Sequence, residues 1–291
     1  MADRSIKRRE NLSDVLFGFS GPMFEFGEQV KNISLEELHP FKNHPFKVID
    51  DEKMQETVES IAEHGVLVPG IARPREDGGY EIISGHRRKR GAELAGKKEV
   101  PFLVRNYTDD EATIIMVDAN IQRENLLPSE KAFAYKMKND ALKHQGKKSD
   151  KSTYELVGEK AGDTAKTVQR YIRLTELYSD LLDMVDSNKI GFIVGSELSF
   201  LKPEEQKLVY EWILKSGKKI TVEQAECLKK NSQTGEFDVS ILEYNSSVQK
   251  KTRGLRLKAK WRNEFFSDCD SDEDIEKLIY ELLCQWKDNR G

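Results

Sequence analysis

The segment from Tyr80 to Arg123 constrains the fold of this chain more than any other. It opens with a short β-branched run, Tyr80 to Ser84, which lies between glycines, and such a pattern is typical of a strand between two turns. An arginine-rich helix follows Gly85, a second apolar strand spans Val100 to Val104, and another helix leads to a polar cluster. The segment is thus predicted to combine strands and helices.

The helix after Gly85 carries Arg87 and Arg88 in its first turn. A helix N-terminus presents unpaired backbone N–H groups and a partial positive charge, so two cations there oppose the helix dipole. A bound anion would compensate, because N–H groups and guanidinium groups both match phosphate oxygens. The residues by themselves leave two interpretations open, a phosphate site or a solvated basic turn.

The next helix is predicted to begin at Thr108, because Thr108 and Glu111 have the spacing of a capping box. It ends in the cluster Asp118-Ala119-Asn120. An aspartate and an asparagine near a helix end suit a hydrated Mg²⁺, which takes one or two protein oxygens together with phosphates. Simple capping and turn formation explain the same residues.

A pair of short helices is predicted further along the chain, from Thr153 to Lys160 and from Thr164 to Leu174, with a glycine-containing turn between them. These are the proportions of a helix-turn-helix. Thr164 or Asp163 caps the second helix. This helix carries a polar stripe without acids at positions i, i+3, i+4 and i+7, formed by Lys166, Gln169, Arg170 and Arg173. Such a face is suited to the major groove, where Gln contacts adenine edges and Arg contacts guanine edges.

The charge distribution agrees with a nucleic-acid partner better than the total charge does. The 291-residue chain has a formal net charge of -4. Between Lys131 and Arg173, however, there are eleven cations and five acids, which gives a local net charge of +6. A concentration of positive charge on this scale indicates phosphate binding.

Two motifs in this chain resemble those of a known family. Ser84-Gly85-His86-Arg87-Arg88 is similar to the pattern GERRxRA, and Asn120-Ile121-Gln122-Arg123 is similar to ENxQR. Both belong to the ParB/Spo0J (ParB/RepB/Spo0J) family of chromosome- and plasmid-partition proteins, and the resemblance covers roughly residues 35 to 215. It implies an α+β ParB-like nucleotide-binding domain, then an all-α helix-turn-helix domain and a small helical C-terminal module.

The resemblance implies that the N-terminal domain binds CTP with Mg²⁺. The implied nucleotide-binding residues are Gly65, Pro69, Ser84, Gly85, His86, Arg87, Arg88, Asn120 and Arg123, and Asn120 is also the implied Mg²⁺ ligand. Two departures from the family pattern limit this carry-over. The usual QPR is replaced by His44-Pro45-Phe46, and the glutamate associated with hydrolysis is replaced by Ala119. Asp118 lies one residue earlier, but that shift on a helix rotates a side chain by about 100°. Binding of CTP is therefore better supported than a weak CTPase activity.

The resemblance also implies a function and partners. The protein would be a homodimer that recognises a palindromic, centromere-like site in double-stranded DNA and closes around it as a CTP-gated sliding clamp. The implied DNA-binding residues are Thr164, Lys166, Thr167, Gln169, Arg170 and Arg173. The basic residues Lys7 to Arg9 are expected to contact a ParA-type ATPase. A protein of this kind is cytoplasmic and nucleoid-associated.

Domain boundaries follow from composition and periodicity. An amphipathic helix is predicted from Asp51 to His64, a strand interrupted by Pro69-Gly70 from Val66 to Arg73, and a helix from Glu197 to Leu201. The polar stretch 216–255 has the composition of a linker. The expected organisation is a flexible tail (1–32), the ParB-like domain (33–125), the helix-turn-helix domain (126–215), the linker (216–255) and a helical C-terminal module suited to dimerisation (256–291).

Other functional classes are less compatible with the sequence. No apolar run approaches the ~20 residues that a membrane span needs, so no membrane partner is expected. The segment Gly158 to Gly162 has the glycine spacing of a Walker phosphate loop, but Asp163 stands where lysine is required. A sulfiredoxin-like reductase needs a cysteine beside its His-Arg pair, and here Ser84-Gly85 stand there. A helix-turn-helix transcription regulator or a nucleoid-occlusion-type factor without nucleotide switching remains the alternative.

Overall fold

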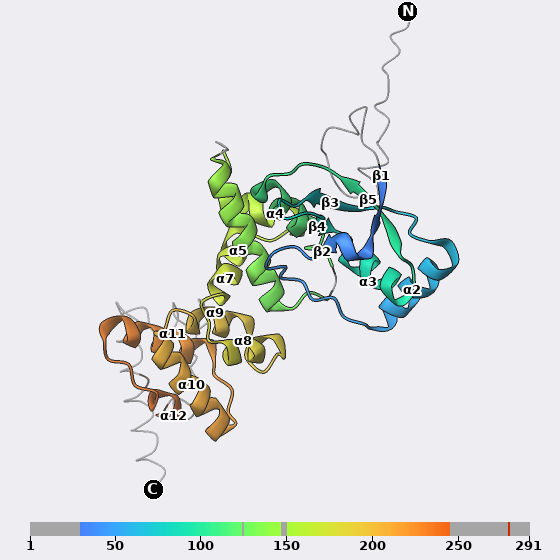
Figure 1. Ribbon diagram of the computed structural model, residues 1–291. Helices are drawn as coiled ribbons and strands as arrows, with labels where there is room; N and C mark the ends of the chain where they lie inside the picture. Colours follow the sequence, from blue (N-terminus) through green and yellow to red (C-terminus); the bar gives the residue numbers. More distant parts are fainter. Residues whose placement is uncertain (1–29, 124, 147–149, 245–278, 280–291) are drawn as a thin grey trace, which may run out of the picture. The chain divides into compact units, whose positions relative to one another are not determined.

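The computed structural model describes residues 30–123, 125–146, 150–244 and 279 (Figure 1). The chain forms two compact units, Met1–Val239 and Ser240–Gly291. In the second unit, the described residues contain the short helix α12 (Ile241–Tyr244). All the sites considered below lie in the first unit.

A mixed five-stranded sheet organises the N-terminal part of the first unit. Its strands are β1 (Val30–Ser34), β2 (Leu38–His39), β3 (Gly70–Pro74), β4 (Tyr80–Ser84) and β5 (Glu99–Val104), in the spatial order β1-β5-β3-β4-β2. The pairs β1/β5 and β3/β4 are antiparallel, whereas β3/β5 and β2/β4 are parallel. The short 3₁₀ helix η1 (Leu35–Glu37) separates β1 from β2.

Both faces of the sheet are covered, and the consecutive residues Ile82 and Ile83 mark them. Successive side chains of a strand point to opposite faces. Ile82 packs with Ile61 of α2 (Glu52–His64) and Ala92 of α3 (His86–Leu94). Ile83 instead packs with Met116 of α4 (Asp109–Asp118) and with residues of α5 (Pro128–Gln145). The sheet is thus buried between two helical layers.

The remaining helices of the first unit continue from α5. They are α6 (Thr153–Gly158), the 3₁₀ helix η2 (Glu159–Ala161), α7 (Ala165–Leu174), α8 (Ser179–Asp186), α9 (Phe192–Leu198), α10 (Pro203–Ser216) and α11 (Val222–Thr234). Val157 of α6 and Val168 of α7 belong to the same buried cluster as Ile83 and Met116. The α6–α7 pair therefore shares a core with one face of the sheet. None of the described helices is both long enough and apolar enough to cross a bilayer.

Several elements lie where the sequence predicted them. β4 has the predicted bounds, β5 differs by one residue, and Thr108 and Glu111 form the predicted capping box. The α+β character of the N-terminal part is confirmed, whereas a separate helix-turn-helix domain followed by a C-terminal module stays a prediction.

The structure corrects four boundaries. The strand predicted from Val66 to Arg73 begins only at Gly70. Residues 30–32, predicted to lie in the tail, belong to β1 and are held by pairing with β5. The helix predicted from Glu197 to Leu201 is α9, which begins at Phe192 and ends at Leu198.

The fourth correction concerns the segment 216–255, which the composition indicated as a linker. It contains α11, whose Ala225 and Leu228 are fully buried. The Thr221–Gln224 capping box and the left-handed Gly235 define the ends of this helix. The basic residues Lys7 to Arg9 lie outside the described residues, as does the module 256–291 apart from residue 279.

Candidate functional site

The turn between β4 and α3 depends on Gly85. This residue has a φ of 111° and occupies the N-cap position of α3, a conformation that residues with a Cβ rarely adopt. A Cβ at Gly85 would also lie 3.1 Å from the Cα of Gly70, at the start of β3. The glycine therefore lets two backbone segments approach closely, and the first N–H groups of α3 lie at this junction.

Arg88 connects α3 to the loop that precedes β3. Its Nη1 donates to the carbonyl oxygen of Pro69 at 2.8 Å, and burial lowers the pKa of this guanidinium. The loop begins after α2 at Gly65, which has a φ of 71° and caps that helix. Pro69, one of the implied nucleotide-binding residues, is thus brought into contact with the arginine motif.

Arg87 has an intramolecular partner that the sequence analysis did not identify. Its Nη2 lies 3.0 Å from Oδ1 of Asp51, the residue whose side chain caps α2. Arg90, a more exposed residue of the same helix, pairs with Asp50 at 2.6 Å. Two acids therefore compensate part of the positive charge in the first turns of α3, and an anion is not the sole explanation for it.

Two histidines and Arg123 lie close to the arginine motif. The rings of His44 and His86 have centroids 3.9 Å apart. His86 Nε2 accepts from the backbone N–H of Phe41 at 3.4 Å. Burial, together with the charges of His44 and Arg123, lowers the pKa of His86 to about 3. Both burial and the charge of Arg87 lower the pKa of Arg123. These histidines are therefore neutral near pH 7, and Arg87 and Arg123 are close enough to repel each other.

These residues fit an anionic group such as a nucleotide phosphate. They combine N–H groups at the start of a nine-residue helix, a glycine without a Cβ, and the guanidinium groups of Arg87, Arg88 and Arg123. Backbone N–H groups and guanidinium groups are the usual protein ligands of phosphate. Ser84 lies at the end of β4, directly before this turn.

The residues beside Ala119 do not fit a Mg²⁺ held by the protein. Asn120 is 4% exposed, and its Nδ2 donates to the carbonyl oxygen of Met116 at 2.7 Å, which leaves one amide oxygen. The Asp118 carboxylate lies 2.6 Å from Nζ of Lys138 and 3.4 Å from Nζ of Lys160. Asp118 therefore does not replace the missing glutamate. No group of three metal-binding side chains occurs among the described residues.

The α6–α7 pair is held together by a close approach at Gly158. A Cβ at this position would lie 2.3 Å from the carbonyl oxygen of Asp163. Gly162, with a φ of 71°, ends η2, and Thr164 caps α7 by accepting from the N–H of Thr167 at 3.2 Å. The caps and the tight turn fix the start of α7.

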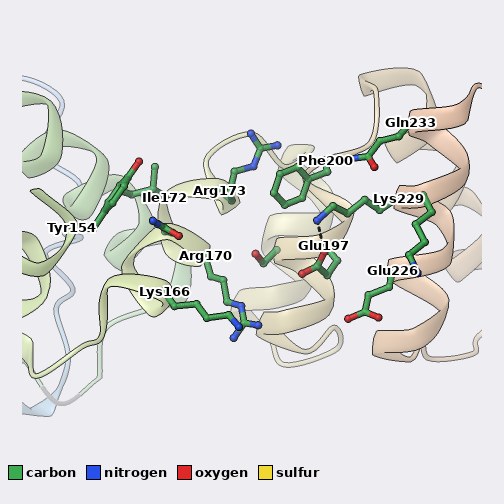
Figure 2. Close-up of a pocket in the computed structure, with 13 residues that line it drawn as sticks. Tyr154, Lys166, Arg170, Ile172, Arg173, Glu197, Phe200, Glu226, Lys229 and Gln233 are labelled. Atoms are coloured by element: carbon green, nitrogen blue, oxygen red, sulfur yellow. Dashed lines mark hydrogen bonds and ion pairs between the residues drawn. The ribbon is translucent and has the colours of Figure 1, made fainter. Parts of the chain in front are cut away.

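The predicted polar stripe of α7 faces a cavity of about 670 Å³ (Figure 2). Its four residues Lys166, Gln169, Arg170 and Arg173 all line this cavity, while Val168 and Leu174 of the same helix are fully buried. The stripe is therefore brought together as the sequence predicted.

Arg173 differs from the other residues of the stripe. Its Nη2 donates to the carbonyl oxygen of Ser199 at 2.5 Å, and its guanidinium lies 4.1 Å from the ring centroid of Phe200. Lys166 and Arg170 make no ion pair with any residue in the described part of the chain. Arg173 therefore supports the wall of the cavity, and the other cations are available to a ligand.

The opposite wall of the cavity comes from α11 and was missed by sequence reasoning. Its lining residues are Glu226, Lys229, Lys230 and Gln233. Their spacing of i, i+3, i+4 and i+7 is that of one helix face, and the capping pair Thr221 and Gln224 marks the start of this helix. The polar composition of the segment concealed this pattern.

Comparison with known proteins identifies the family. Residues 23–121 match the family model described as ParB N-terminal domain. The chain is 34% identical to the chromosome-partitioning protein Spo0J of Thermus thermophilus over 203 residues, which are 70% of this chain and 71% of that protein. The chain belongs to the ParB family. The resemblance found in the two sequence motifs is thereby confirmed.

The chain is also similar to a protein with a different name and to two solved structures. A nucleoid occlusion protein of Geobacillus sp. (strain WCH70) is 30% identical over 201 residues, 68% of each chain. Two crystal structures of a C-terminally truncated ParB from Caulobacter crescentus also match. The one complexed to the centromeric parS site has a TM-score of 0.44 and 24% identity, and covers 69% of this chain and 99% of that chain. The one complexed with CTP-γ-S has a TM-score of 0.31 and 26% identity, and covers 64% and 99%.

Proposed function

We propose that this ParB-family protein is a sequence-specific DNA-binding protein of chromosome or plasmid partition. The α7 face carries the proposal, since Lys166, Gln169 and Arg170 line one cavity without acidic partners among the described residues. Gln and Arg side chains discriminate base edges in the major groove, and Lys contacts phosphates. Thr164 and Thr167 at the start of α7 would contact the DNA backbone. Such a protein is expected to be associated with the nucleoid.

A binding experiment with α7 variants tests this proposal. We expect Gln169→Ala and Arg170→Ala to lower the affinity for a duplex that carries the recognised site by about 5- to 150-fold, since one good base contact contributes ~1–3 kcal/mol. Binding to mixed-sequence DNA should change much less, because most of that affinity comes from phosphates. Equal losses on both duplexes would contradict base recognition by α7.

We also propose a more specific mechanism, a CTP-gated clamp in which two copies of the chain close around DNA. The convergence of Gly85, Arg87, Arg88 and Arg123 supports nucleotide binding. Asn120 lies at the end of the same region, but the donor set there does not fit a protein-held Mg²⁺. Any Mg²⁺ that accompanies CTP would be held by the nucleotide, and with Ala119 in place of glutamate we expect little or no hydrolysis.

Calorimetric titration distinguishes the clamp from a simple DNA binder. CTP, ATP, GTP and UTP are titrated with and without Mg²⁺ into the wild type, Arg88→Ala and the control Arg90→Ala. Selective CTP binding that is lost in Arg88→Ala and kept in Arg90→Ala is the expected result, since Arg90 pairs with Asp50 on an exposed part of α3. Absence of nucleotide binding, with and without DNA, would rule out the gated clamp.

A nucleoid-occlusion-type factor without nucleotide switching is the second candidate. The similarity to the nucleoid occlusion protein from Geobacillus supports it. Both candidates bind DNA through α7, so the titration with CTP separates them. Contact of a ParA-type ATPase with Lys7 to Arg9 also stays a proposal, which a pull-down with the chain lacking these residues tests.

A further inference from the structure

Helix α11 faces α7 across the cavity in Figure 2. We propose that α11 is a phosphate-binding wall of the DNA site, so that Lys229 and Lys230 contact the backbone of the duplex whose bases face α7. This inference rests on the proposed DNA-binding function and extends it to a segment that neither motif covers. It also gives Arg173 a positioning role in place of base contact.

The charge balance of the cavity carries the inference. Its lining contains five cations and two acids, Glu197 and Glu226, although the whole chain has more acids than bases. Glu197 is already paired with Lys229 at 2.9 Å. Lys166, Arg170 and Lys230 make no ion pair with any described residue. Cations gathered on two facing helices raise the local positive potential and attract an anion.

The wall is ordered before any ligand binds. The exposed ring of Phe200 has the Arg173 guanidinium 4.1 Å and the Lys229 Nζ 3.7 Å from its centroid. Glu197 and the carbonyl oxygen of Ser199 hold these two cations in place. Figure 2 shows the ring between them, with Lys229 reaching from α11 and Arg173 from α7. Because Lys229 is already held in place, its side chain loses little entropy on binding a phosphate.

The position of the stripe on α11 supports the same conclusion. Ala225, Leu228 and Ser232 are buried, whereas Glu226, Lys230 and Gln233 are exposed on the cavity side. Gln233 has an amide that donates to phosphate or sugar oxygens, as polar side chains commonly do at DNA backbones. The duplex backbone is a better match for this open, charged wall than an apolar small molecule, because only Tyr154, Ile172 and Phe200 add apolar lining.

The test measures how the affinity for a mixed-sequence duplex of about 20 base pairs, two turns of B-DNA, depends on salt. Each lost phosphate contact makes the slope of log Kobs against log salt shallower by about 0.9. Lys230→Ala is compared with Lys219→Ala, an exposed lysine outside the cavity. Glu226→Lys adds a cation to the same wall and should make the slope steeper by about 0.9.

Opposite changes of slope in Lys230→Ala and Glu226→Lys, with Lys219→Ala unchanged, are the expected result. If both variants match Lys219→Ala while Arg170→Ala weakens binding to the duplex that carries the recognised site, α11 does not contact DNA and only this inference fails. If the wild type binds no duplex at low salt, the proposed function fails as well. Circular dichroism of each variant shows that the helices remain folded.

Discussion

The carboxylate of Asp118 lies 2.6 Å from the Nζ of Lys138, and the two side chains are only 7% and 5% exposed. This buried ion pair joins the end of α4, directly before Ala119 and Asn120, to α5. Lys138 also donates to the carbonyl oxygen of Val157 in α6, and Lys160 lies 3.4 Å from the same carboxylate. The end of the second sequence motif is thus connected to the helix pair that contains α7.

Removing one partner of this ion pair should be strongly destabilising. We expect Asp118→Ala to lower the free energy of unfolding by about 3–5 kcal/mol, because Lys138 is left buried without a counter-charge. Urea denaturation measures the change. Asp110→Ala, which removes a half-exposed acid beside the exposed His144, should cost less than about 1 kcal/mol. Equal losses in the two variants would show that the buried pair contributes little.

Gly85 should tolerate substitution less well than another glycine of positive φ. Gly85→Ala meets both backbone strain and the Cα of Gly70 at 3.1 Å, whereas Gly96, with a φ of 67°, has no atom within 4 Å of the position that an added methyl group would take. We expect Gly96→Ala to cost about 1–2 kcal/mol from strain alone, and Gly85→Ala to cost more. Thermal or urea unfolding compares them. A smaller loss in Gly85→Ala would contradict the close approach of the two backbones.

Arg173 and Arg170 lie on the same face of α7 but should respond differently to truncation. Arg173→Ala removes the hydrogen bond to Ser199 and the contact with Phe200, so we expect a loss of stability of about 1–3 kcal/mol. Arg170→Ala should change stability by less than about 0.5 kcal/mol and weaken DNA binding. Measuring unfolding and DNA affinity on both variants separates the two roles. If Arg173→Ala is as stable as the wild type, Arg173 would again be a candidate for direct contact with DNA.

The half-buried pair of His44 and His86 should make stability depend on pH. The pKa of His86 is about 3 in the folded protein, against an ordinary value of 6.5. The unfolded chain therefore takes up a proton near pH 6.5 while the folded chain does not. His86 therefore does not reduce the free energy of unfolding above pH 6.5. Below that pH the free energy of unfolding decreases as the pH falls toward 3, with a slope of up to about 1.4 kcal/mol per pH unit.

Urea denaturation between about pH 7 and pH 5, above the range where most carboxylates titrate, measures this slope. His86→Gln should flatten it, whereas His64→Gln, at the exposed end of α2, is the control. Burial also lowers the pKa of His44, so His44 would account for any slope that remains in His86→Gln. An unchanged slope in His86→Gln would contradict the assignment of a neutral His86.

Local patterns were sufficient for much of the fold and of the candidate site. β4, the Thr108 cap and the stripe on α7 depend on residues close together in sequence, so periodicity and capping chemistry predicted them. The α11 wall was missed because its apolar face is narrow, with Ala225 and Leu228 as its fully buried residues. A helix of this kind is stabilised by packing more than by its own composition.

The sequence by itself determined the motifs, and with them the family, because the glycine and arginine spacing around Gly85 and Asn120 is a local property. Only the tertiary structure decided which charges are available. Asp118 lies on the chain beside the nucleotide motif, but Lys138 and Lys160 neutralise it. Arg173 belongs to the α7 stripe, but Ser199 and Phe200 hold it. Charge pairing acts over a few ångströms in space, so residues distant in sequence determine whether a polar side chain remains available for a ligand.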